Sequence, residues 1–231
     1  MTKEDELRKE FDEISNIPEK KWSHNHFHYK YIVEHIDIQN PICLEIGCGK
    51  GELANQLTRK CRHIDAIDIS SGMIKQAKYN FGDNHKINFI CGDITTIQLE
   101  ECSYDLIISK DAAHHIDFEW LCNLVNRVLK VNGQFILIDF YQLTTFLDYI
   151  NSLTSTVADS ICNIVYNGRI SEYTKAEKEI WKKHEMNDNF APFQNIKRIS
   201  SQTLLSSTVY KSFFWRYILF WRKPDINDII K

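Results

Sequence analysis

Three glycines lie at alternate positions in residues 42–53, ICLEIGCGKGEL, directly after an apolar run. The whole chain of 231 residues holds only 8 glycines, so this cluster needs a physical reason. Glycine loses more backbone entropy on folding than any other residue, and it suits a sharp turn or the close approach of a ligand to the backbone. Gly47, Gly49 and Gly51 therefore predict a strand that turns tightly into a helix and leaves bare backbone beside a ligand.

Acidic residues accompany the first three apolar runs of this region. Glu45 lies just before the first glycine, Asp68 ends HIDAID, and Asp93 follows INFICG. A carboxylate has two acceptor oxygens, so Asp68 can accept hydrogen bonds from both hydroxyls of a ribose. Asp93 can accept a hydrogen bond from an adenine amino group, with Ile69 and Ile94 beside the ring. Together these residues predict a site for an adenosine that carries a charged tail.

Two classes of ligand bind at a glycine turn of this kind. Dinucleotide-binding folds use G-x-G-x-x-G and hold a pyrophosphate at the helix N-terminus. The spacing here is G-x-G-x-G, and the acidic Glu45 suits an ammonium group better than a pyrophosphate. These residues favour S-adenosyl-L-methionine, whereas Asp68 alone fits the ribose of either ligand. An NAD-dependent oxidoreductase is therefore the first alternative.

The elements that position these residues follow from the hydrophobic pattern. Apolar runs of strand length (ICLEIG, HIDAIDI, INFICGD, YDLIISK and GQFILIDF) alternate with helix-length segments. Continuous apolar strands separated by helices predict a mostly parallel sheet covered on both faces, which is a doubly wound α/β fold. We expect Ser70 or Ser71 to cap a helix, and Asn132-Gly133 to close the helix before the fifth strand. The final segment, VYKSFFWRYILFWRKP, predicts two antiparallel strands at the sheet edge.

Composition limits the classes of function. The net charge is −3 at pH 7, which is unlike the basic surplus of a general nucleic-acid binder. No apolar run is long enough to span a membrane, and the charged start MTKEDELRKEF does not resemble a secretory signal. The 7 cysteines include no CxxC pair, so we interpret them as reduced thiols. We therefore expect a cytoplasmic protein without nucleic-acid or membrane partners.

Five motifs in this order resemble the class I S-adenosylmethionine-dependent methyltransferases. They are LEIGCGKG, IDAIDIS, FICGDI, YDLIISKDAAHHI and RVLKVNGQFILI, and they span roughly residues 41–140. Small-molecule methyltransferases of this type often also have a W-x-H-N segment before the first motif and a W-R-Y segment near the end. Those match residues 22–25 and 215–221 here. The resemblance implies a seven-stranded Rossmann-like sheet with an antiparallel C-terminal strand and a helical lid.

The resemblance also implies roles for individual residues. The strand-one turn would contact the methionine part of the cofactor, Asp68 the ribose, and Asp93 the adenine, while the residues that end strand four would lie along the methionine. Lys110 and Asp111 depart from the small or apolar residues common at that position in the family. The predicted cofactor-binding set is Glu45, Gly47, Cys48, Gly49, Asp68, Ile69, Met73, Asp93, Ile94, Ser109 and Lys110.

Methyl transfer needs a general base only when the acceptor must lose a proton. The candidates for such a base are His115, His114, Asp111 and His28. The triplet His24, His26 and His28 could suggest a metal, but no carboxylate lies beside it in the sequence. We therefore expect no metal.

The chain divides into four predicted parts. Residues 1–40 form an N-terminal helical lid, 41–140 the cofactor-binding core, 141–200 a helical insertion that caps the substrate, and 201–231 the C-terminal strands. The aromatic lid segments, and SKDA in place of an N-P-P-[YF] signature, favour a small-molecule methyl acceptor. The protein would act as a monomer or homodimer. A non-catalytic S-adenosylmethionine-binding protein is the second alternative.

Overall fold

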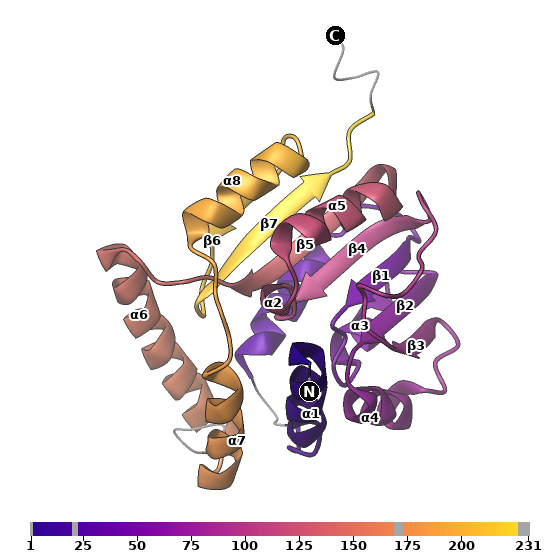
Figure 1. Cartoon of the computed structure of the whole chain (residues 1–231). Helices are drawn as coiled ribbons and strands as arrows, with labels where there is room; N and C mark the ends of the chain where they lie inside the picture. Colours follow the sequence, from indigo (N-terminus) through magenta and orange to yellow (C-terminus); the bar gives the residue numbers. More distant parts are fainter. Residues whose placement is uncertain (1, 20–22, 169–172, 226–231) are drawn as a thin grey trace.

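The apolar runs form the strands of one sheet in the computed structural model, which describes residues 2–19, 23–168 and 173–225 (Figure 1). The strands are β1 (Ile42–Ile46), β2 (His63–Asp68), β3 (Ile87–Cys91), β4 (Tyr104–Lys110), β5 (Leu129–Phe140), β6 (Thr208–Lys211) and β7 (Arg216–Arg222). Their order in the sheet is β3-β2-β1-β4-β5-β7-β6. Because the order reverses beside β1, ligands are expected outside the carboxyl ends of β1 and β4.

The direction of each strand confirms the predicted fold class. β1 pairs in parallel with both β2 and β4, and the parallel pairing continues to β3 on one side and to β5 on the other. β7 is antiparallel to β5, and β6 is antiparallel to β7. The aromatic C-terminal segment thus forms the antiparallel pair that its sequence predicted. The fold is a Rossmann-like α/β sheet of seven strands.

Helices cover both faces of the sheet. The α-helices are α1 (Lys3–Ser15), α2 (His24–Glu34), α3 (Glu52–Leu57), α4 (Ser71–Phe81), α5 (Phe118–Val128), α6 (Phe146–Cys162), α7 (Lys175–Glu185) and α8 (Phe193–Thr203), and two short segments are η1 (Ala113–His115) and η2 (Asn163–Asn167). Side chains of α5 and α8 share one hydrophobic cluster with the sheet, whereas those of α2, α3 and α4 share the other. Within the described residues, no helix is long and apolar enough to cross a membrane.

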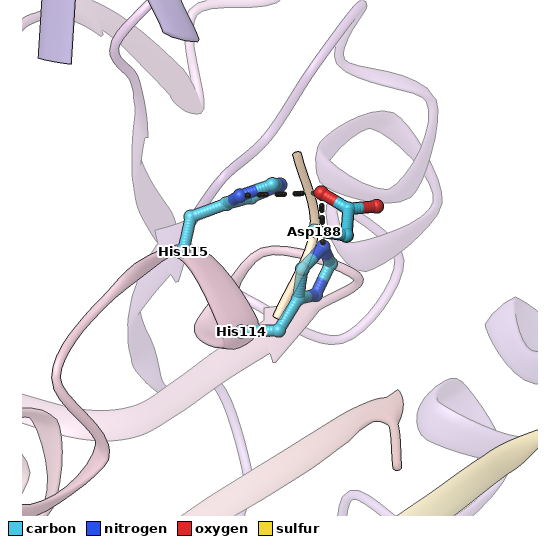
Figure 2. Close-up of side chains that lie close together, drawn as sticks. All are labelled: His114, His115 and Asp188. Carbon is cyan, nitrogen blue, oxygen red and sulfur yellow. Dashed lines mark ion pairs between the residues drawn. The ribbon is translucent and has the colours of Figure 1, made fainter. Parts of the chain in front are cut away.

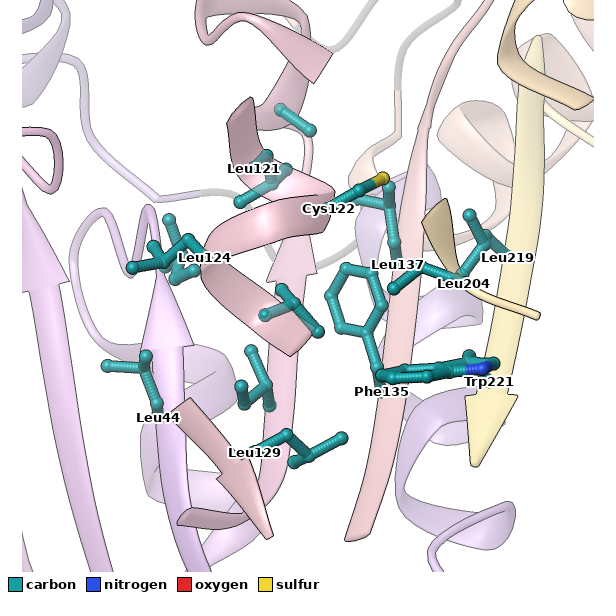
Figure 3. Close-up of a cluster of buried hydrophobic side chains, with 14 of the residues drawn as sticks. Leu44, Leu121, Cys122, Leu124, Leu129, Phe135, Leu137, Leu204, Leu219 and Trp221 are labelled. Carbon is teal, nitrogen blue, oxygen red and sulfur yellow. The ribbon is translucent and has the colours of Figure 1, made fainter. Parts of the chain in front are cut away.

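The alternation of side chains along each strand builds these two clusters. Successive residues of a strand point to opposite faces of a sheet. Leu44 of β1 accordingly packs in the cluster below α5, and its neighbour Cys43 packs in the cluster on the other face. Figure 3 shows the first cluster, where Phe135 and Trp221 fill the space between α5 and β7. All seven cysteines are free thiols.

Of two predicted helix ends, one is wrong and one is confirmed. The expectation that Asn132-Gly133 closes a helix is wrong, because α5 ends at Val128 and β5 already begins at Leu129. Asn132 has a φ of 64° and lies where the β4–β5 register shifts, so the pair makes an irregularity inside the strand. By contrast, Ser70 is the N-cap of α4, and its side chain accepts a hydrogen bond from the amide of Met73, as expected.

The predicted cap at 141–200 contains elements with different surroundings. α6 projects from the sheet (Figure 1), and its apolar side chains Phe146, Leu153 and Val157 are exposed. α8 instead packs against α5, and Ile196 is buried in the sheet cluster. This part of the segment therefore belongs to the layer that covers the sheet.

Two neighbouring leucines test the packing at the end of α8. Leu204 is fully buried in the core, whereas Leu205 is exposed. Because Leu204→Ala removes buried apolar atoms and leaves a cavity, we expect it to lower the free energy of unfolding by about 2–5 kcal/mol. Leu205→Ala is the matched control, with an expected change within about 0.5 kcal/mol. Urea unfolding measures both, and equal effects of the two substitutions would contradict this packing.

Candidate active site

The carboxyl ends of the parallel strands open into one cavity of about 400 Å³. This is the size of a small-molecule or cofactor site. The opposite wall is made by α1, through Leu7, Phe11 and Ile14, and by Trp181 of α7. Of the predicted cofactor-binding residues, those that line the cavity are Glu45, Gly47, Cys48, Gly49, Asp68, Ile69, Met73, Asp93, Ile94 and Lys110.

The glycine turn has the backbone that its sequence predicted. Gly47, Gly49 and Gly51 all have positive φ, at 78°, 51° and 81°. A Cβ on Gly47 would lie 2.2 Å from Cβ of Ala112, and a Cβ on Gly51 would lie 2.8 Å from the ring of Phe89. A Cβ on Gly49 would meet no heavy atom within 4 Å. Gly47 and Gly51 thus allow close packing, whereas Gly49 presents open backbone to the cavity.

Glu45 is a buried carboxylate at the base of the cavity. Its side chain is only 2% exposed, and Oε2 has no hydrogen-bond partner among the described residues. Burial, together with the nearby charge of Asp68, raises the pKa of Glu45 well above its usual range. A buried acid without a partner is costly, so the site favours a ligand that brings a positive charge or a hydrogen-bond donor to Oε2.

Asp68 is the last residue of β2, and its side chain is hydrogen-bonded to the glycine turn. Its Oδ2 accepts a hydrogen bond from the amide of Gly49 at 2.8 Å, and its Oδ1 accepts one from the amide of Ser70 at 2.9 Å. Burial raises the pKa of this carboxyl group, although the two amide hydrogen bonds oppose that effect. Each carboxylate oxygen can accept a further hydrogen bond, so Asp68 keeps acceptor capacity toward the cavity.

The third strand end adds an acceptor and an apolar side chain to the wall of the cavity. Oδ1 of Asp93 accepts hydrogen bonds from the amide and the hydroxyl of Thr95, at 2.8 and 2.7 Å. Ile94 is buried beside it, and Ile69 and Met73 line the same cavity. These apolar side chains around an acceptor suit a flat heterocycle that carries an amino group.

A residue of α1 that the sequence analysis did not identify fixes this helix over the site. Oδ1 of Asp12 accepts hydrogen bonds from the hydroxyl of Ser70 at 2.5 Å and from the amide of Gly72 at 2.8 Å. The amides at the start of a helix lack partners within that helix, so an acidic side chain from elsewhere is stabilising there. Asp12 thereby attaches α1 to the start of α4, next to Asp68.

A buried network of charges borders the cavity at the end of β4. Asp111 accepts hydrogen bonds from Nε and Nη2 of Arg216, at 2.6 and 2.7 Å, and it forms an ion pair with Lys110. Asn25 of α2 accepts hydrogen bonds from Lys110 and Arg216, at 2.8 and 3.1 Å. The W-x-H-N and W-R-Y segments contain Asn25 and Arg216, so these segments were the sequence signal for the network. Trp22 lies outside the described residues.

The network also sets the protonation of its members. Burial alone would raise the pKa of Asp111, but the charges of Arg216 and Lys110 outweigh it and hold that pKa well below its usual range. Burial lowers the pKa of Lys110 to about 8. Asp111 is therefore an ionised structural partner with little affinity for a proton.

The predicted catalytic residues do not all lie at the cavity. His115 and Asp111 line it, whereas His114 and His28 are absent from its lining. Both ring nitrogens of His28 are buried without a hydrogen-bond partner among the described residues, and burial lowers the pKa of this side chain to about 3. Ser109, expected along the cofactor, is also buried away from the lining and donates a hydrogen bond to the carbonyl of Ile46.

Comparison with known proteins gives the class of this chain. Residues 44–137 match the family described as a methyltransferase domain. An uncharacterized methyltransferase of Mycobacterium tuberculosis is 24% identical over 211 residues, which is 89% of this chain and 99% of that protein. Malonyl-[acyl-carrier protein] O-methyltransferase of Priestia megaterium is 40% identical over 93 residues, which is 39% of this chain and 31% of that protein.

Solved structures confirm the fold. One chain of the complex between the Haloferax volcanii Trm112 methyltransferase activator and a methyltransferase has a TM-score of 0.65 at 14% identity, and the match covers 95% of this chain and 98% of that chain. Residues 44–137 thus carry a methyltransferase domain, within a chain that has the fold of the class I methyltransferases. S-adenosyl-L-methionine is the methyl donor of this family. This match favours a methyltransferase over the NAD-dependent oxidoreductase.

Arg216 and Arg222 allow a matched test of the buried network. Arg216 is 1% exposed and pairs with Asp111, whereas Arg222 pairs with Asp37 at the surface. Removing one partner of a buried pair leaves an uncompensated charge, so Arg216→Met should lower the free energy of unfolding by about 3–5 kcal/mol. Arg222→Met should lower it by about 0–1 kcal/mol. Guanidinium unfolding compares them, and an Arg216→Met effect as small as that of Arg222→Met would contradict the structural role of the network.

Proposed function

We propose that this enzyme transfers the methyl group of S-adenosylmethionine to a small molecule bound between the strand ends and α1. The observation that carries the proposal is the position of α1, whose residues Leu7, Phe11 and Ile14 form the wall of the cavity opposite Glu45 and Asp68. A cavity of about 400 Å³ with a helix across it suits a small acceptor better than the surface of a folded protein or a nucleic-acid duplex.

The residues of the cavity fit the cofactor of the family. Oε2 of Glu45 has no hydrogen-bond partner within the described residues and would accept a hydrogen bond from the ammonium group, while the open backbone at Gly49 allows the amino-acid part to approach closely. Asp68 would accept hydrogen bonds from the ribose. Asp93 and Ile94 would hold the adenine, with Ile69 and Met73 against the ring. When bound, S-adenosylmethionine supplies a methyl group on a positively charged sulfur that is already a good leaving group.

The chain itself contributes position and the exclusion of water. Holding an acceptor in line with the reacting carbon can supply on the order of 7–11 kcal/mol of the barrier. Asp111 lines the cavity, but its pKa is held well below its usual range by Arg216 and Lys110, and His28 lies outside the lining, so both are poor bases for a bound acceptor. His115 lines the cavity as well, and we propose that no base is needed because the acceptor is nucleophilic at neutral pH without losing a proton, as a carboxylate is. The Priestia megaterium relative is a malonyl-[acyl-carrier protein] O-methyltransferase, and a malonyl acceptor supports the carboxylate class over the shared 93 residues.

The pH dependence of cofactor affinity tests the role of Glu45. Its pKa in the free protein is raised by burial and by Asp68, whereas a bound ammonium group favours the ionised form and lowers that pKa. Binding should therefore release a proton, and affinity should rise with pH through the raised pKa and then level off. Calorimetry with S-adenosylmethionine from mildly acidic to mildly alkaline pH measures this.

Glu45→Gln is the control for this experiment, because glutamine keeps the shape but does not titrate. We expect weaker binding and a smaller pH dependence in the variant. Asp68 still titrates in both proteins, so the difference between the two curves isolates Glu45. Identical pH dependence in the wild type and in Glu45→Gln would show that the ammonium group does not bind there.

The substrate class is tested by transfer of labelled methyl from S-adenosylmethionine. A panel of small carboxylates, phenols, amines and thiols would be compared with a protein extract and with total RNA. We expect turnover with small molecules, highest among carboxylates. Label that enters only protein or RNA would overturn the proposed substrate class while leaving the family assignment intact.

A further inference from the structure

Three histidine rings surround one carboxylate oxygen behind the wall of the cavity. Oδ1 of Asp188 lies 3.8 Å from Nε2 of His114, 3.8 Å from Nδ1 of His115 and 3.7 Å from Nε2 of His184. Figure 2 shows the rings of His114 and His115 turned toward this oxygen. Ligand atoms of His114, His115 and Asp188 all lie within 4.8 Å of one another. Residues distant in the sequence thus direct four polar atoms at one point.

Hydrogen bonding does not account for this arrangement. Distances of 3.7–3.8 Å exceed the range of protein hydrogen bonds. Oδ1 of Asp188 accordingly has no hydrogen-bond partner among the residues that the structure describes, although it is buried. A buried carboxylate oxygen without a hydrogen-bond donor is costly, so a cation at the centre of the cluster would stabilise it.

The hydrogen bonds of Nδ1 in His114 and His184 also support a cation at this point. Nδ1 of His114 lies 2.6 Å from Oδ1 of Asp139, and Nδ1 of His184 lies 3.0 Å from Oε2 of Glu10. A carboxylate accepts hydrogen bonds, so in each neutral ring Nδ1 donates and Nε2 holds a lone pair. Both lone pairs face the oxygen of Asp188. Metal-binding histidines have this pattern, in which an outer carboxylate fixes the ring and its tautomer.

The spacing of His114, His115 and Asp188 suits one ion. Zinc binds histidine nitrogen and carboxylate oxygen at about 2.0–2.2 Å, so tetrahedral ligand atoms lie about 3.3–3.5 Å apart. Both histidine nitrogens lie 3.8 Å from Oδ1 of Asp188, and the three atoms lie within 4.8 Å of one another. Nε2 of His184 lies 3.7 Å from the same oxygen but outside that mutual group, so its ring would move toward a bound ion. The side chains are between 6% and 11% exposed, and Phe11 packs against the rings of His115 and His184. A buried set of four ligands is typical of a structural zinc site.

We propose that His114 Nε2, His115 Nδ1, His184 Nε2 and Asp188 Oδ1 bind one divalent transition-metal ion, for which zinc is the best match. Asp139 and Glu10 orient two of the ligands from outside. The expectation of no metal rested on the cysteines and on the histidines at 24–28. His184 and Asp188 lie far along the chain from His114, so no local spacing indicated this site.

The ion would connect the parts of the chain that enclose the cavity. His114 and His115 follow β4, Asp139 belongs to β5, His184 belongs to α7, and Glu10 belongs to α1. A metal at this point would hold α1 and α7 over the carboxyl ends of the strands. Only His115 of the four ligands lines the cavity, so the role is structural and does not depend on the proposed function.

The test uses the full chain without a histidine tag. After dialysis against a chelator, the protein is titrated with Co²⁺ alone, whose visible absorption bands report nitrogen and oxygen ligands, and then with Zn²⁺ as a competitor. We expect one Co²⁺ per chain, displacement by Zn²⁺ and a higher melting temperature with either ion. His184→Gln removes a ligand and should weaken Co²⁺ binding by about 100-fold or more, while Glu10→Gln should weaken it by about 10–100-fold.

His85→Gln is the matched control, since His85 is exposed on the loop between α4 and β3. It should bind Co²⁺ as the wild type does. Circular dichroism confirms that each variant is folded, and Glu10→Gln replaces His184→Gln if the latter is not. Absence of one-to-one binding by the wild type overturns the proposal. Binding that His184→Gln and Glu10→Gln leave unchanged overturns it equally, because the metal would then lie elsewhere.

Discussion

The site depends on one physical constraint, which is the free-energy cost of burying the carboxylate of Glu45 at the end of β1. Glu45 lies in the central strands of a sheet covered on both faces, and one of its oxygens has no partner among the described residues. The glycine turn, the strand ends and α1 line the cavity beside this carboxylate. A positive group on a ligand therefore interacts more strongly with this buried carboxylate than it would with a carboxylate at the protein surface. Binding and the exclusion of water follow from one arrangement.

The sequence predicted the central sheet because the spacing of apolar residues depends directly on the geometry of strands and helices. Alternating apolar runs and helices define a parallel sheet, and parallel strands place their carboxyl ends at one edge. Any polar residue that ends such a strand must then lie near the others. For this reason Glu45, Asp68 and Asp93 could be assigned to one site from the sequence. The glycine spacing added the turn, since positive φ at Gly47 and Gly49 excludes most other residues.

Long-range contacts lay beyond these patterns. Asp12 binds the start of α4, and Arg216 pairs with Asp111, which lies 105 residues earlier in the chain. The W-R-Y segment marked Arg216 but not its partner, and nothing in the neighbourhood of Asp12 distinguishes it from an ordinary surface charge. Asn132-Gly133 is a wrong prediction and not a missed contact. This dipeptide is typical of a turn after a helix, but here it lies inside a long strand where the register shifts.

The lid segments differ from the core in how they are fixed. α1 is attached by the hydrogen bonds of Asp12 and by the buried contact of Glu10 with His184 on α7. α1 also packs through Phe11 and Ile14 in a small apolar cluster with Met73 of α4 and Trp181 of α7, whereas α5 and α8 are held by a larger one. The wall of the cavity thus combines these polar contacts with a small apolar cluster, and together they set the space that remains for a methyl acceptor.

A crystal structure with S-adenosylhomocysteine bound tests the central claim most directly. The account predicts the amino group within hydrogen-bond distance of Oε2 of Glu45, the ribose hydroxyls on Asp68, and the adenine between Ile94 and Met73. Space for an acceptor should remain between the sulfur and α1. A ligand whose amino group lies away from Glu45, with that carboxylate still unpartnered, would contradict the account.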